Sequence, residues 1–123
     1  HLKKDGGAGQ DVYVRPADDF YLLRPEIAEA YFYMYRGTGD ERFRTLAHQL
    51  VLDIRRHAKA KYGYSSLSGV QNTAVRTFRD DQPSYFFAET LKYLFLVQVD
   101  ESIFDLKRFV LNTEAHPTEI WTP

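Results

Sequence analysis

The sequence contains no cysteine, which excludes disulfide bonds, thiolate nucleophiles and zinc sites built from cysteine. It also has no excess of one charge, because 16 basic and 17 acidic residues nearly cancel and no run of Lys or Arg is longer than two. This balance indicates neither a nucleic-acid partner nor an anionic membrane surface. The longest nearly uncharged apolar stretch, residues 93–99, is far too short to span a bilayer.

An N-terminal methionine and a signal-peptide pattern are also missing, since the chain opens with His1. We therefore expect it to be a segment of something longer. Its 123 residues with a hydrophobic fraction of 44% are nevertheless enough for one ordinary domain with a core.

Aromatic residues are plentiful: nine Phe, nine Tyr and one Trp make up 15% of the chain. They indicate either an aromatic-rich core or a carbohydrate site, in which flat rings pack against the apolar C–H faces of sugars. Composition by itself favours the core.

The first half of the chain predicts two helices. Residues 25–36 form the first, because Pro25 suits a first helical turn and residues 37–39 (Gly-Thr-Gly) mark an end. Residues 41–59 form the second, since their apolar side chains recur at i, i+3 and i+4, and Asp40 is the expected N-cap.

The second half predicts a third helix and a β-like end. Residues 62–83, rich in Ser, Gly, Asn and Thr, predict short strands or a long loop. Residues 84–97 predict a helix that is apolar almost all round and therefore needs burial on most of its surface. Two β-prone runs, residues 108–111 and 119–121, flank the polar tip 112–117 and predict a hairpin.

The beginning of the chain carries weaker signals. Residues 1–10 are polar and glycine-rich, which predicts a loop or frayed end. Residues 11–19 predict an extended lead-in.

Four glutamates stand in surroundings that suit a general acid or base, since loss of solvation raises the pKa of a carboxyl group. Glu26 and Glu29 lie one turn apart on one helical face, Glu89 interrupts an apolar helix, and Glu114 lies at a predicted turn. Their spacing alone identifies no reaction.

Each candidate also has a structural explanation. The two glutamates of the first helix could simply complement the helix dipole, and Glu89 could pair with Arg24, Lys92 or another buried cation. Thr113 could be a plain turn residue, and His116 a satisfied surface histidine.

Three blocks of sequence carry a family resemblance: VRPADDFYLLRPE (14–26), AETLKYLFL (88–96) and NTEAHP (112–117). In order and separation they resemble the class I α-1,2-mannosidases of glycoside hydrolase family 47, and TGDERF (38–43) and GYSSL (63–67) fit the same pattern. The likeness covers nearly all of residues 11–121.

The resemblance implies a mainly α fold, namely the C-terminal portion of an (αα)7 barrel with a terminal β-hairpin that reaches into the barrel. Residues 1–123 would then be the C-terminal segment of one catalytic domain, without separate domains, and residues 11–121 its family-like region.

The resemblance also implies an activity: calcium-dependent, inverting hydrolysis of terminal α-1,2-linked mannose on N-glycans. Thr113 would hold Ca²⁺, which prefers oxygen ligands, through its hydroxyl and carbonyl oxygens. Glu26 would be the base that activates water, and with Glu89 and Glu114 would orient the waters of the ion. The implied substrate-binding residues are Arg24, Glu29, Tyr85, Glu89 and Glu114.

Two positions depart from the family pattern, since Pro83 replaces an acidic residue and Tyr85 replaces the usual sugar-stacking Phe. Tyr85 keeps the apolar face but adds a hydroxyl that needs a partner. We expect the difference to affect linkage preference or affinity, and not the calcium site.

The family's general acid lies upstream of the blocks present here. We therefore expect this chain alone to be inactive and poorly stable, and to act with the N-terminal remainder of the catalytic domain on a mannose-rich N-glycan. The implied location is the endoplasmic reticulum or Golgi lumen, or outside the cell.

Two alternatives to an enzyme segment remain open. One is a non-catalytic, lectin-like mannose-binding module of glycoprotein quality control with the same fold. The other is a helical interaction domain with an accidental likeness.

Overall fold

The computed structural model describes residues 14–121 except 73 and 75. The predicted loop over residues 1–10 lies outside this range. In the described part of the predicted lead-in, residues Pro16–Asp18 form a short 3-10 helix, η1, so the expectation of an extended segment was wrong there. Pro16 favours the first position of a helical turn, and Arg15 pairs with Asp18 at 2.6 Å across it.

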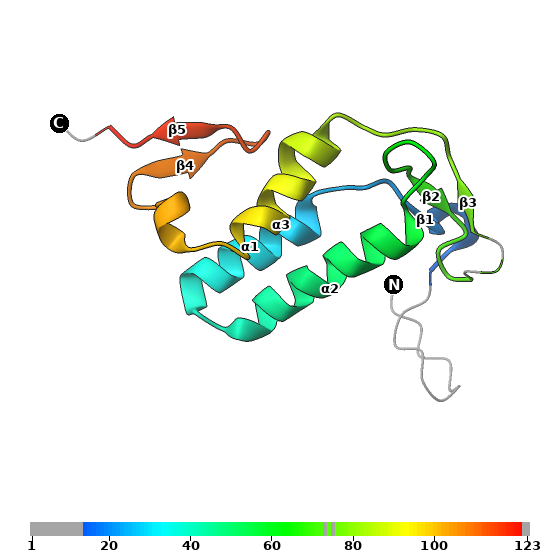
Figure 1. Ribbon diagram of the computed structural model, residues 1–123, viewed down its shortest axis with the longest axis horizontal. Helices are drawn as coiled ribbons and strands as arrows, with labels where there is room; N and C mark the ends of the chain where they lie inside the picture. Colours follow the sequence, from blue (N-terminus) through cyan, green and yellow to red (C-terminus); the bar gives the residue numbers. More distant parts are fainter. Residues whose placement is uncertain (1–13, 73, 75, 122–123) are drawn as a thin grey trace.

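Helices α1 (Glu26–Thr38) and α2 (Glu41–His57) pack against each other along their lengths (Figure 1). Both were predicted; α2 begins at the predicted residue, and the other three ends are displaced by one or two residues. Gly39, with φ 67°, ends α1 in the left-handed conformation that glycine adopts without strain. Asp40 caps α2 as expected, because its carboxylate accepts a hydrogen bond from the Arg42 backbone N–H at 3.0 Å.

A small antiparallel sheet lies beyond the C-terminal end of α2 (Figure 1). It consists of β1 (Phe20–Tyr21), β2 (Leu67–Ser68) and β3 (Thr77–Phe78), in the order β1-β2-β3. Tyr21 is paired with Leu67, so the sheet joins the segment before α1 to the loop after α2. The short strands predicted within residues 62–83 are confirmed.

The third predicted helix differs in kind from the expectation. It opens as a π-helical segment, η2 (Phe86–Leu91), and continues as helix α3 (Lys92–Leu96). The prediction of one α-helix over residues 84–97 was therefore wrong for its first half, where hydrogen bonds of the i→i+5 type widen the helix. Phe87 and Phe95 remain 56% and 57% exposed, so the burial expected for this apolar helix is incomplete within the described chain.

The predicted hairpin is present and consists of β4 (Phe109–Leu111) and β5 (Pro117–Glu119). Its second strand was predicted at residues 119–121 and begins two residues earlier, so the turn is shorter than the predicted tip 112–117. A 3-10 helix, η3 (Glu101–Ile103), precedes it. The hairpin lies beside α3 with its turn directed toward that helix (Figure 1).

The buried core joins the helices, the small sheet and the tip of the hairpin in one cluster. It comprises Leu23, Ala28, Phe32, Ala47, Ile54, Ala58, Leu67, Phe86, Tyr93, Leu94, Leu96, Val97 and Ala115. The fold is thus mainly α, as predicted. None of the helices described is both long enough and apolar enough to cross a membrane.

Candidate active site

Three segments that are distant in sequence bring the predicted carboxylates together: the start of α1, the π-helical η2 and the hairpin turn. Glu89, on η2, is only 8% exposed. Its pKa is raised, chiefly because burial removes water from the carboxylate, and further by the charges of Glu114, Glu29 and Glu26. The Glu114 carboxylate lies close enough to hydrogen bond with protonated Glu89. The other three glutamates therefore all act electrostatically on Glu89, and the four are called the acidic cluster below.

No ion pair neutralises Glu89 among residues 14–121 that the structure describes. The Lys92 ammonium donates instead to the Ala115 backbone carbonyl at 2.6 Å, and Arg24 lies 3.7 Å from Glu26 as an exposed pair. The alternative in which Arg24 or Lys92 pairs with Glu89 is therefore wrong. Negative charge is left in excess in the cluster.

Tyr85 lies beside this cluster, since the charges of Arg24, Glu26 and Glu89 all act on its hydroxyl. Burial is the main reason that the pKa of Tyr85 is raised. The hydroxyl has the partner that the sequence required, because it donates to the Leu22 carbonyl at 2.7 Å. The bond fixes the ring beside the beginning of α1.

The hairpin turn exposes Thr113 and Glu114 to solvent. The Asn112 side-chain oxygen accepts hydrogen bonds from the backbone N–H groups of Glu114 and His116, both at 2.9 Å. This arrangement keeps the turn closed, and the Thr113 side chain makes no hydrogen bond to any other residue that the structure describes. His116 is exposed at the surface, as its structural explanation requires.

Oxygen atoms and uncompensated negative charge are the features that suit a hard divalent cation such as Ca²⁺. Within the described ranges, no three His, Asp or Glu side chains converge so as to hold a metal directly. The residues therefore fit an ion held at the Thr113 turn with carboxylates around it better than one held in a cage of carboxylates.

Tyr93, which was not among the site residues predicted from the sequence, contacts Glu29 of the acidic cluster. Its hydroxyl donates to Glu29 Oε1 at 3.2 Å. Burial raises the pKa of Tyr93, and the charge of Glu29 raises it further. The position of Tyr93 four residues after Glu89 was the one available signal, because i and i+4 share a helical face.

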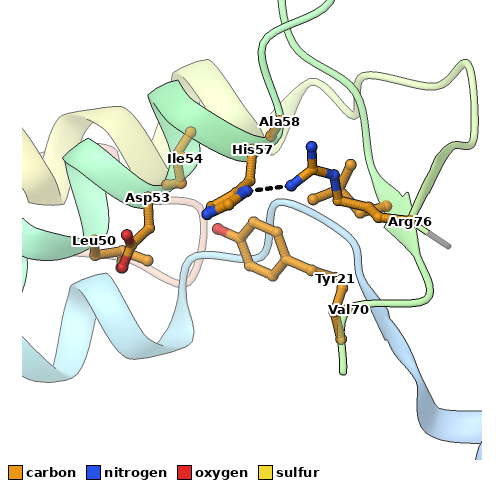
Figure 2. Close-up of a pocket in the computed structure, with 9 residues that line it drawn as sticks. Tyr21, Leu50, Asp53, Ile54, His57, Ala58, Val70 and Arg76 are labelled. Atoms are coloured by element: carbon orange, nitrogen blue, oxygen red, sulfur yellow. Dashed lines mark hydrogen bonds between the residues drawn. The ribbon is translucent and has the colours of Figure 1, made fainter. Parts of the chain in front are cut away.

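A separate cavity of about 380 Å³ lies between α2 and the small sheet. Figure 2 shows Tyr21, His57 and Arg76 facing one another across it, with a hydrogen bond between His57 and Arg76. The Tyr21 hydroxyl is buried without a partner among the described residues, and its pKa is raised to about 12, mainly by burial. None of the residues predicted to form the site lines this cavity.

Comparison with known proteins identifies relatives of this chain. A model of glycosyl hydrolase family 47 matches residues 3–120. The human endoplasmic reticulum mannosyl-oligosaccharide 1,2-alpha-mannosidase is 44% identical over 116 residues, which are 93% of this chain and 17% of that protein. The mannosyl-oligosaccharide 1,2-alpha-mannosidase IA of Sus scrofa is 40% identical over 116 residues, which are 94% of this chain and 17% of that protein.

A solved structure supports the same assignment. The alpha-1,2-mannosidase from Trichoderma reesei matches 85% of this chain with a TM-score of 0.79 and 38% identity, over 22% of its own chain. The present chain thus spans less than a quarter of each of these relatives. It belongs to glycosyl hydrolase family 47.

Proposed function

We propose that this chain is the C-terminal part of a catalytic domain that removes terminal α-1,2-linked mannose from N-glycans. The reaction is calcium-dependent and inverting, and takes place in the lumen of the secretory pathway or after secretion. The fold of the whole domain is an (αα)7 barrel, of which the described helices and hairpin are one portion. The longer protein that contains this segment is called the parent protein below.

One observation carries the proposal: carboxylates of the hairpin turn and of the start of α1 act on the same buried residue, since the charges of Glu114, Glu29 and Glu26 all raise the pKa of Glu89. Among the described residues, the Arg24–Glu26 ion pair compensates one of these four carboxylates. A helical scaffold without a site has no reason to gather the other three beside it, because like charges repel in a region of reduced solvation. An acidic cluster of this kind suits the recognition of sugar hydroxyls together with a cation.

Glu26 is the base in this proposal. Its carboxylate is exposed at the beginning of α1, where Arg24 lies 3.7 Å away and can orient it. A carboxylate in this position can take a proton from water that attacks the anomeric carbon on the face opposite the leaving group. The general acid comes from the N-terminal remainder of the domain.

The other carboxylates and one aromatic ring hold the sugar. Glu29, Glu89 and Glu114 accept hydrogen bonds from mannose hydroxyls, and Arg24 donates to sugar oxygens. The Tyr85 ring packs against the apolar face of the mannose, in an orientation set by its bond to the Leu22 carbonyl.

Thr113 would hold the calcium ion, with its hydroxyl and backbone oxygens as ligands. When bound, the ion supplies positive charge that orders oxygen atoms of the substrate and lowers the pKa of nearby water. Glu26, Glu89 and Glu114 would supply negative charge that balances the charge of the ion.

The test follows the products of α-1,2-linked mannobiose, incubated with the parent protein, by NMR. We expect β-mannose as the first product, its loss on adding a chelator, and its recovery with calcium. Glu26→Gln should lower kcat by about 10²–10⁴-fold, the usual contribution of a general base. α-Mannose as the first product, or full activity in chelator, contradicts the mechanism, and binding without cleavage supports the lectin-like alternative.

A further inference from the structure

Two residues that flank the candidate site have left-handed backbone conformations although neither is glycine. Leu23, directly before Arg24, has φ 59°, and Ala115, directly after Glu114, has φ 55°. Both are completely buried, with 0% exposure. A residue with a Cβ atom disfavours this conformation, so it persists only where the surroundings hold it.

The carbonyl groups of both residues are held by side chains of one helical segment. The Thr90 hydroxyl donates to the Leu23 carbonyl at 2.7 Å, and the Lys92 ammonium donates to the Ala115 carbonyl at 2.6 Å. Thr90 is itself completely buried, so no water replaces its bond when it is lost. Glu89 lies on the same segment, one residue before Thr90.

We propose that Thr90 and Lys92 are positioning residues of the active site. Each fixes one strained turn, so that Thr90 sets residues 24–26 and Lys92 sets residues 113–114 relative to Glu89. The helical segment that carries Thr90 and Lys92 thus aligns the loop that bears Glu26 with the turn that bears Thr113. This inference rests on the proposed function, since the aligned groups are those assigned to it.

A merely structural role for these two side chains makes a different prediction. It would lower the stability of the whole domain without a selective effect on either turn. The relevant measurement therefore resolves the two turns separately, and amide hydrogen exchange of peptides covering residues 22–26 and 112–116 does so.

The experiment uses the parent protein with four substitutions. Thr90→Val keeps the shape of the side chain and removes its hydroxyl, whereas Thr90→Ser keeps the hydroxyl. Lys92→Met removes the ammonium, whereas Lys92→Arg keeps a cationic donor. Val97→Ala is the matched control, because Val97 is fully buried and makes neither carbonyl bond.

Thr90→Val should speed amide exchange about tenfold in residues 22–26 and leave exchange in residues 112–116 unchanged. Lys92→Met should speed exchange about tenfold in residues 112–116 and leave residues 22–26 unchanged, because each variant loses one hydrogen bond to a buried turn. In both variants kcat should fall about tenfold, with a smaller change in KM. Only Lys92→Met should also weaken calcium binding, which calorimetry measures. Thr90→Ser and Lys92→Arg should restore most of each loss. Val97→Ala should lower Tm without changing kcat or calcium affinity.

Exchange that rises equally in both turns, or in neither, overturns the proposal. So does selective exchange in an active parent protein whose kcat and calcium affinity stay at wild-type values. A wild-type parent protein that neither binds calcium nor releases mannose refutes the proposed function instead. Selective exchange in its variants would then still support the roles of Thr90 and Lys92 in holding the two turns.

Discussion

The Tyr93 hydroxyl donates a hydrogen bond to Glu29 Oε1 at 3.2 Å, which ties the aromatic core of α3 to a carboxylate in the first turn of α1. Tyr93→Phe removes this donor and keeps the buried ring. We expect the variant to lose about 1.5–3 kcal/mol of unfolding free energy, because a hydrogen bond to a charged group is lost. We also expect a lower kcat, since Glu29 becomes free to turn.

Denaturant unfolding and mannobiose kinetics of the parent protein check this prediction. Tyr33→Phe is the matched control, because the Tyr33 hydroxyl interacts with Tyr93 but makes no recorded hydrogen bond to Glu29. An equal loss of kcat in both variants would contradict a specific role for the Tyr93–Glu29 bond.

The raised pKa of Glu89 predicts how stability depends on pH in the absence of calcium. The folded protein keeps the Glu89 proton at pH values where the unfolded chain has lost it, so this residue weakens stability as pH rises above the ordinary value of 4.5. Glu89→Gln removes the penalty. The variant should therefore be more stable than wild type at pH 7, and the gap should close as pH falls toward 4.5.

Thermal unfolding of the parent protein in chelator, measured across this pH range, tests the sign. The control is Glu119→Gln, whose carboxylate is 68% exposed and should change stability little at any pH. A Glu89→Gln variant that is less stable than wild type at neutral pH would show that Glu89 is stabilised as the anion.

Thr113→Ala should abolish the stabilisation of the parent protein by calcium. The substitution removes the side-chain oxygen at the exposed hairpin turn and leaves the Asn112 bonds that close it. Wild type should gain about 2.7 kcal/mol at a calcium concentration 100 times its dissociation constant. Thr118→Ala, an exposed change on β5, should keep this gain, and an undiminished gain in Thr113→Ala would remove Thr113 from the site.

The isolated 123-residue chain should release no mannose. It lacks a general acid in the proposed mechanism, and the exposed Phe87 and Phe95 leave apolar surface without cover. We expect a low Tm that rises when the N-terminal remainder of the domain is added. Robust release of mannose by the purified chain would refute the claim that the general acid comes from the N-terminal remainder of the domain.

Local signals predicted much of the fold. Asp40 identified the start of α2 because an N-cap acts through bonds within one turn, and the polar tip at residues 112–117 identified the hairpin. The isolated charge of Glu89 in an apolar segment indicated its burial. These features depend on neighbours close in sequence, and so can be recognised there.

Other features depend on contacts that sequence order does not reveal. Leu23 and Ala115 adopt left-handed conformations without the glycine that usually marks one, because distant side chains hold their carbonyls. The π-helical geometry of η2 likewise has no marker in its residue types. The family resemblance, rather than composition or spacing, singled out Thr113.

Calcium soaked into crystals of the parent protein, with anomalous scattering used to locate it, tests the central claim most directly. The account predicts a peak about 2.3–2.6 Å from both the hydroxyl and the carbonyl oxygen of Thr113, the usual Ca²⁺–oxygen distance, with Glu26 and Glu89 nearby. A peak remote from the hairpin turn, or none at saturating calcium, would contradict it.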